Sequence, residues 1–161
     1  FIGTDGLDAP DPPTAITPTV GVGTVSIAFT APTDAGTSAI TGFVAQVSTD
    51  GTNYSTGSNT GTSSPIVVSD LSSAASTAKV WAINAYGTSA PSVASASFTP
   101  AAARAIFAGG DVSGQRNDIR YFTLASTGNT TDFGNLSAVR SSINDSGASS
   151  TRGIFAGGRN S

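Results

Sequence analysis

The sequence predicts an all-β protein built from two modules, and three observations carry this prediction. Residues that favour helices are scarce: Glu and Met are absent and Lys79 is the only lysine, whereas Thr, Ser, Gly, Val and Ala are abundant. Short apolar stretches alternate with turn signals along residues 10–99, at the spacing of an antiparallel sandwich. An octet recurs near the C-terminus, as ARAIFAGG at residues 103–110 and TRGIFAGG at residues 151–158.

The first module is predicted from its alternating stretches. Residues 1–9 are turn-rich and indicate a linker or the tail of a preceding segment. Period-two alternation then predicts strands at TVSIAFT (24–30), ITGFVAQVS (40–48), PIVVSDL (65–71), AKVWAINAYG (78–87) and VASASFT (93–99). Their apolar anchors are Val25, Ile27, Phe29, Phe43, Ala45, Val47, Ile66, Val68 and Leu71. Asp50-Gly51 predicts a hairpin turn.

Five stretches follow one another in a familiar order, namely DPPTAI, SIAFTAP, GTSAITGF, SDL and VWAINAYGTSAPS. Together they resemble the fibronectin type III family over residues 10–99, which implies an immunoglobulin-like sandwich. The sequence departs from the family at two positions. Phe29 stands where the family has a tryptophan on the second strand, and Ser76 stands where it has a tyrosine at the corner before the penultimate strand. Both departures predict a weaker core, supported by neighbours.

The resemblance also implies a register for the penultimate strand. Aligned on Asn84 and Gly87, alternate residues point inward, namely Ala78, Val80 and Ala82. The outward set, joined by Val44 of the adjacent strand, is Lys79, Trp81 and Ile83. An exposed cluster of this kind is typical of an interface. The alternative is a slipped register in which Trp81 fills the core space left by Phe29.

The recurring octet predicts a repeat module over residues 100–161. Its two copies are 48 residues apart (151 − 103 = 48) and agree at six of eight positions, and an interval near fifty residues is typical of propeller repeats. RAIFAGG predicts an apolar strand closed by a glycine turn, and DIRYFTLAS (118–126) predicts a second strand. STGNTTDFGNL is expected to turn at Gly128-Asn129 and to offer Phe133 and Leu136 as anchors.

This module resembles the kelch-like repeats of large structural proteins of marine tailed phages. The matching residues are Tyr121, Gly128, Asn129, Asp132, Phe133, Gly134 and Leu136. The resemblance implies a propeller-blade-like module, with one repeat and the start of a second. The sequence departs from ordinary kelch repeats in its longer spacing and in lacking the late tryptophan, for which Phe133 is the nearest substitute.

One blade cannot bury both of its faces, so the apolar residues of the module are expected to contact further polypeptide. The interface residues predicted here are Ile106, Phe107, Tyr121, Phe133, Ile154 and Phe155. Further repeats beyond Ser161 are the first expectation, since a start at Phe1 rather than Met favours an incomplete sequence. Sister chains that supply the neighbours, and partial disorder, are the alternatives.

The chain contains few residues of the types that enzymes use for catalysis. His, Cys and Glu are absent, so the usual general bases, nucleophile–base pairs and zinc ligands cannot be assembled. The aspartates sit mostly in turn contexts, which explains them without a hydrolytic pair. Asp5, Asp8 and Asp11 lack the alternate-position spacing of a calcium loop and indicate a linker. We therefore expect no enzyme, no metal and no cofactor.

The charge distribution limits the classes of partner. Residues 1–100 carry six Asp and one Lys (−5), and residues 101–161 carry six Arg and four Asp (+2), which sum to the net charge of −3. The arginines are dispersed, which disfavours nucleic-acid binding. No apolar run is long enough to predict a membrane span, and no signal peptide is visible.

Together these features predict a non-enzymatic structural protein of a tailed-phage virion. It would lie at the virion surface as a capsid decoration, fibre or tail appendage and work by adhesion. The expected partners are other virion proteins and copies of itself, with host-surface glycan as a further one. The alternative is a secreted bacterial adhesin or a carbohydrate-binding accessory module.

Overall fold

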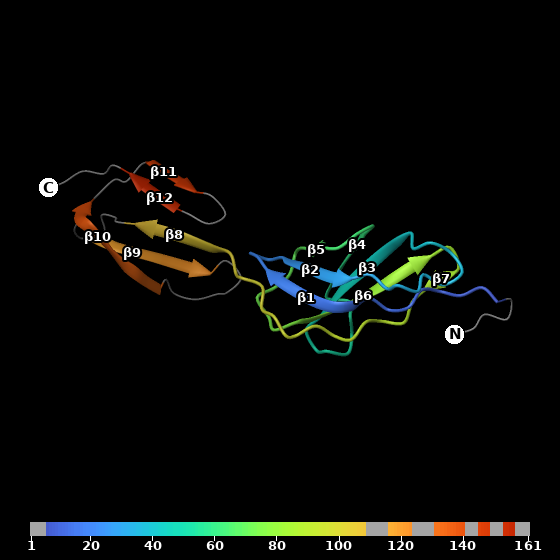
Figure 1. Cartoon of the computed structure of the whole chain (residues 1–161). Helices are drawn as coiled ribbons and strands as arrows, with labels where there is room; N and C mark the ends of the chain where they lie inside the picture. The colour runs from blue at the N-terminus through green and yellow to red at the C-terminus, as the bar shows by residue number, and fades with distance from the viewer. Residues whose placement is uncertain (1–5, 109–115, 124–130, 141–144, 149–152, 157–161) are drawn as a thin grey trace. The chain divides into compact units, whose positions relative to one another are not determined.

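The chain divides into an N-terminal unit, residues 1–101, and a C-terminal unit, residues 102–161 (Figure 1). The computed structural model describes residues 6–108, 116–123, 131–140, 145–148 and 153–156. Every regular element in these described ranges is a β-strand. The predicted all-β class is therefore confirmed.

Two antiparallel sheets form the N-terminal unit. The first has the strand order β1-β2-β5 and the second the order β4-β3-β6-β7. The strand bounds are Thr14–Val20 (β1), Val25–Thr30 (β2), Gly42–Ser48 (β3), Gly57–Gly61 (β4), Ile66–Val68 (β5), Thr77–Asn84 (β6) and Gly87–Thr88 (β7). Strands β2, β3, β5 and β6 arise where the sequence predicts them.

The core lies between these sheets because alternate residues of the strands point inward. Its members are Val25, Ile27, Phe29, Phe43, Ala45, Val47, Ile66, Val68, Leu71, Ala78, Val80, Ala82 and Phe98. Phe29 occupies the core position expected for a tryptophan and packs on Phe43, with ring centroids 4.8 Å apart. Ser76, at the position expected for a tyrosine, donates its hydroxyl to the carbonyl of Ala74 at 3.0 Å.

Strands β1 and β4 were not predicted, and both lie at sheet edges. Strand β1 contains Pro18, which is tolerated there because an edge strand needs fewer backbone donors. Strand β4 reads GSNTG and has no apolar residue to produce an alternating pattern. Hydrophobic periodicity therefore does not predict edge strands that have few inward-facing apolar residues.

The segment before β1 belongs to the N-terminal unit from Gly6 onward. The Asp8 amide donates to Thr37 Oγ1 at 2.6 Å, and the Thr37 amide returns a bond to the Asp8 carbonyl at 3.1 Å. The Asn84 side chain also donates to the Asp8 carbonyl, at 2.9 Å. The prediction of a linker over residues 1–9 is therefore wrong for residues 6–9, which these polar contacts tie to the sandwich.

The last predicted strand, residues 93–99, does not form. Instead, three serines placed every third residue pair with alternate residues of β6: Ser89 with Ala82, Ser92 with Val80 and Ser95 with Ala78. In each pair the serine amide donates to the β6 carbonyl at 2.8–3.0 Å, and the serine Oγ accepts from the β6 amide at 2.9–3.0 Å. We call this arrangement the serine ladder.

The serine ladder explains why an extended strand is unnecessary at this edge. Two residues of β6 span roughly 6.6 Å, so three ladder residues cover the same length and advance about 2.2 Å each. Each serine hydroxyl also donates to the carbonyl of the residue that follows it, at 2.7–2.9 Å. Each serine thus offers β6 a donor and an acceptor, as a strand residue would, with its Oγ in place of the backbone carbonyl.

Replacing Ser92 with alanine is expected to lower the free energy of unfolding by about 2 kcal/mol, because the buried Val80 amide loses its acceptor. Ser97→Ala, at an exposed position of the same segment, is the matched control and should cost less than about 0.5 kcal/mol. Denaturant titration followed by the fluorescence of Trp81, the only tryptophan, reports on this unit. Equal costs for the two variants would contradict the ladder.

The C-terminal unit contains a three-stranded and a two-stranded antiparallel sheet. The first has the order β10-β9-β8, and the second pairs β11 with β12. The bounds are Arg104–Ala108 (β8), Arg116–Thr123 (β9), Thr131–Arg140 (β10), Asp145–Ala148 (β11) and Gly153–Ala156 (β12). Both copies of the octet supply a strand, β8 and β12, as the sequence predicts; their paired glycines lie outside the described residues.

The stretch TDFGNL lies in strand β10 and not in a turn. A bulge interrupts the pairing of β10 with β9 between Asp132 and Gly134. Gly134 has φ +148°, a conformation that favours glycine, and its amide donates to Asp132 Oδ1 at 3.0 Å. The DFG motif therefore produces a bulge within a strand, and the predicted turn at Gly128-Asn129 falls outside the described residues.

Candidate interface

The outer face of the β4-β3-β6-β7 sheet carries the residues that the sequence predicts as an interface. Strands β3 and β6 pair so that Val44 lies opposite Trp81 and Gly42 lies opposite Ile83. Tyr54, from the loop between β3 and β4, contacts the Trp81 ring. We call Val44, Tyr54, Lys79, Trp81 and Ile83 the outer-face cluster.

The register of β6 follows from its inward residues. Ala78, Val80 and Ala82 are all 0% exposed, which fixes the intervening residues on the opposite face. Trp81 is partly exposed there. The outward register is therefore confirmed, and the alternative with Trp81 in the core beside Phe29 is wrong. Small residues on the inner face of β6 leave room for Phe29 and Phe43, so the core needs no indole.

A hydrogen-bonded turn carries Tyr54 to the cluster. Asp50 Oδ1 accepts from the amides of Asn53 and Thr52 at 2.7 Å each and from Ser48 Oγ at 2.8 Å. These bonds, the Asn53 amide first, hold the pKa of Asp50 well below its usual range because they stabilise the carboxylate. Gly51 completes the predicted turn with φ +73°. The charged form of Asp50 therefore orders the loop that presents Tyr54.

The two aromatic rings of the cluster stand nearly perpendicular. The Tyr54 and Trp81 centroids are 6.3 Å apart with an interplanar angle of 72°, an edge-to-face arrangement. Lys79 Nζ lies 4.6 Å from the Tyr54 ring centroid, within the range of a cation–π contact. The Tyr54 hydroxyl is 3.1 Å from Thr77 Oγ1. These contacts hold the side chains in one arrangement before any partner binds.

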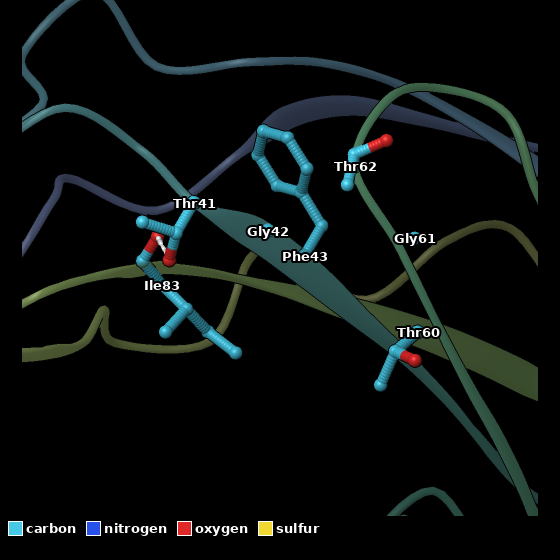
Figure 2. Close-up of a pocket in the computed structure, with 7 residues that line it drawn as sticks. All are labelled: Thr41, Gly42, Phe43, Thr60, Gly61, Thr62 and Ile83. Atoms are coloured by element: carbon cyan, nitrogen blue, oxygen red, sulfur yellow. Dashed lines mark hydrogen bonds between the residues drawn. The ribbon is translucent and has the colours of Figure 1, made fainter.

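A shallow hollow of about 280 Å³ adjoins the cluster at Ile83. Figure 2 shows its lining residues, which are Thr41, Gly42, Phe43, Thr60, Gly61, Thr62 and Ile83. Phe43 and Ile83 project to opposite sides of the sheet in this view. Gly42 lies opposite Ile83 and offers no side chain beside it. The hollow therefore touches the outer-face cluster only at Ile83.

The polar and charged groups of the outer face near the cluster are few in kind. Its polar groups near the cluster are hydroxyls and amides, and its one charged group in the cluster is Lys79. Among the described residues, no group of three or more potential metal ligands comes together. The described part of the chain also contains no helix long and apolar enough to cross a membrane.

The predicted interface residues of the C-terminal unit are placed in part. Ile106 of β8 lies directly opposite Tyr121 of β9, and Ile106 is 38% exposed. The Arg104 guanidinium lies 4.8 Å from the Tyr121 ring centroid on the same face. The backbone of the remaining predicted residues is described, but their side chains are not. These residues are Phe107 on β8, Phe133 on β10, and Ile154 and Phe155 on β12.

Sequence reasoning missed Tyr54 and the hollow beside Ile83. Tyr54 follows the hairpin turn and belongs to no alternating stretch, so its contact with Trp81 depends on the Asp50 turn geometry. The hollow is lined in part by Gly42 and Gly61, which sequence alone does not distinguish from turn glycines. The STDGTNY stretch is the one signal that could have placed Tyr54 beside a strand end.

Known structures with similar folds include parts of titin and of chicken CNTN1. The chain resembles domains A168–A170 of titin, with a TM-score of 0.52 and 23% identity over 58% of this chain and 32% of that one. It also resembles the FN1–FN3 domains of chicken CNTN1, with a TM-score of 0.52 and 20% identity over 73% of this chain and 42% of that one. Titin kinase with its flanking domains matches 58% of this chain and 17% of that one, with a TM-score of 0.51 and 22% identity.

These likenesses concern the fold, because the identities are low and the matches span less than half of each of those chains. They agree with a fibronectin type III-like sandwich, as the sequence predicts. No protein-family model matches the sequence, and no curated protein matches it.

Proposed function

We propose that this protein is a non-enzymatic structural component of a tailed-phage virion, exposed at its surface as a capsid decoration, fibre or tail appendage. The observation that carries the proposal is the outer-face cluster, in which a partly exposed Trp81 is held by Tyr54 and lies opposite Val44. Tryptophan and tyrosine are the residues most often responsible for affinity at protein interfaces. A partner that covers this face would gain most of its affinity from these two rings.

Three further features support a structural role. The chain has no His, Cys or Glu, which leaves it without the usual catalytic pairs. Its charged fraction is 11%, well below that of average domains, so contacts would depend on shape more than on steering. The recurring octet and the kelch-like resemblance of residues 100–161 support the phage assignment. In this role the sandwich is a spacer, and the repeat module presents loops outward.

Labelling of particles tests this proposal directly. Antibodies raised against the purified chain should decorate intact phage particles, released from cells that carry the gene, at positions repeated by the symmetry of the particle. Labelling of the cell wall in place of particles would instead support the alternative, a secreted adhesin or carbohydrate-binding module. Turnover by the purified chain in a hydrolase assay would contradict both.

Replacing Trp81 with alanine is expected to weaken rebinding of the purified chain to particles depleted of it by about 30-fold, the usual effect of removing a central interface tryptophan. Tyr86→Ala is the matched control, because Tyr86 is an aromatic residue 49% exposed and outside the cluster. The control should bind as the wild type does. Equal losses for both variants, or none for Trp81→Ala, would show that the outer-face cluster is not the contact.

A further inference from the structure

Open strand edges are the places where a β-protein most readily pairs with another chain, and native proteins usually block them. In the described sheets of the N-terminal unit, the open edges are β1, β4, β5 and the serine ladder, which follows β7. In those of the C-terminal unit, they are β8, β10, β11 and β12. An edge left unblocked among them is therefore a candidate contact.

The edges of the N-terminal unit are blocked by a proline, a bulge and side-chain hydrogen bonds. Strand β1 contains Pro18 and a bulge. The Asn59 side chain occupies backbone groups of both β4 and β5. Its Nδ2 donates to the Val67 carbonyl of β5 at 2.7 Å, and its Oδ1 accepts from the Thr60 amide of β4 at 2.8 Å. In the serine ladder, the carbonyls of Ala90, Val93 and Ala96 accept bonds from serine hydroxyls and are not left free.

Two edges of the C-terminal unit are also protected, and two are not. Strand β10 carries Asp132, Arg140 and the bulge at Gly134, and β11 begins at Asp145. In contrast, β12 reads GIFA and has no charge, and β8 reads RAIFA with its one charge at the first residue. The two unprotected edges thus belong to the two copies of the octet.

Among the described residues, the first copy lacks the strand partner that the second copy has. Strand β11 (145–148) pairs with β12, and the equivalent positions before the first octet are 97–100 (145 − 48 and 148 − 48). Those residues are committed to the N-terminal unit, because Phe98 exchanges backbone bonds with Ser76, and the adjoining Ala101 donates to the Gly21 carbonyl at 2.9 Å. In the described part of the chain, one edge of strand β8 therefore remains open.

We infer that the open edge of β8 in one copy of this chain pairs with the open edge of β12 in a second copy. The pairing would join the β10-β9-β8 sheet of one molecule to the β11-β12 sheet of the next. Because the two edges differ, the contact is head-to-tail and repeats from copy to copy, giving rings or filaments. The inference deepens the proposed function, since it names a second copy as one structural partner.

The mass of the full-length chain in solution tests this contact. The wild type should form multiples of 15.8 kDa that grow with concentration. Ile106→Lys places a charge at the β8 edge and should leave a monomer. Thr131→Lys, at an exposed position of β10 on the far edge of the same sheet, is the matched control and should still assemble.

Mixing two blocked variants gives the sharpest result. Ile154→Lys blocks β12 and leaves β8 intact, whereas Ile106→Lys blocks β8 and leaves β12 intact. Each variant alone should be monomeric, and an equimolar mixture should stop at a dimer of twice the monomer mass. A monomeric wild type, or a mixture that remains monomeric, overturns the inference. Assembly lost in Thr131→Lys but kept in Ile106→Lys would also overturn it. Particle labelling measures a different property, so the proposed function can fail while this contact holds.

Discussion

Replacing Asn84 with alanine is expected to lower the free energy of unfolding of the N-terminal unit by about 3 kcal/mol, which corresponds to a fall in Tm of about 15 °C. Its side chain is 5% exposed and makes four short hydrogen bonds. Nδ2 donates to the carbonyls of Asp8 and Ala35 at 2.9 Å each, and Oδ1 accepts from the amides of Tyr86 and Gly87 at 2.8 and 3.0 Å.

The cost is large because one side chain joins three separate backbone segments. Alanine would remove the Asn84 partner of the Ala35 carbonyl and of the Tyr86 and Gly87 amides in a site that water reaches poorly, and the Asp8 carbonyl would keep only its bond from the Thr37 amide. Asn59→Ala is the control, since Asn59 is exposed and should cost less than about 1 kcal/mol. Thermal unfolding followed by Trp81 fluorescence measures both. A Tm within a few degrees of the wild type for Asn84→Ala would show that these bonds contribute little.

Replacing Gly36 with alanine is expected to cost about 3 kcal/mol through two separate effects. The residue has φ +71°, where an alanine costs about 1 kcal/mol. An added Cβ would also overlap the Asp8 carbonyl oxygen and lie 2.7 Å from the Ala9 carbonyl oxygen. Relief requires the segment of residues 6–9 to leave the turn that contains Thr37, which breaks the bonds between them.

Gly51 separates the two effects. Its φ of +73° is nearly the same, but no atom lies within 4 Å of the position of an added Cβ. Gly51→Ala should therefore show the backbone cost alone, about 1 kcal/mol, in the same denaturant titration. The difference between the two variants measures the close packing of residues 8–9 on the turn. Equal costs would mean that the N-terminal segment moves aside freely.

The central strands of the sandwich were predictable because their inward and outward residues alternate cleanly. Strands β2 and β3 each bury three apolar residues at period two, and the family register placed β6 correctly. The stretch VASASFT also alternates, yet it does not form a strand. The period-three spacing of Ser89, Ser92 and Ser95 is present in the sequence, but its meaning depends on the facing amides of β6.

The candidate interface was predictable in its centre and not at its margins. Val44, Trp81 and Ile83 follow from the register of two neighbouring strands. Tyr54 joins them through a loop whose path is decided by hydrogen bonds to one carboxylate, which no periodicity encodes. In the C-terminal unit, the pairing of Ile106 with Tyr121 joins two residues that the sequence proposed independently.

The three-to-two correspondence along the serine ladder restricts how this edge can change in length. Insertion of three residues with a serine at the matching place, together with two residues in β6, would add one rung and keep every other rung aligned. Insertion of one or two residues would shift all later serines away from their amides. Natural or designed length variants of this edge are therefore expected to differ by whole triplets, a rule that ordinary paired strands do not follow.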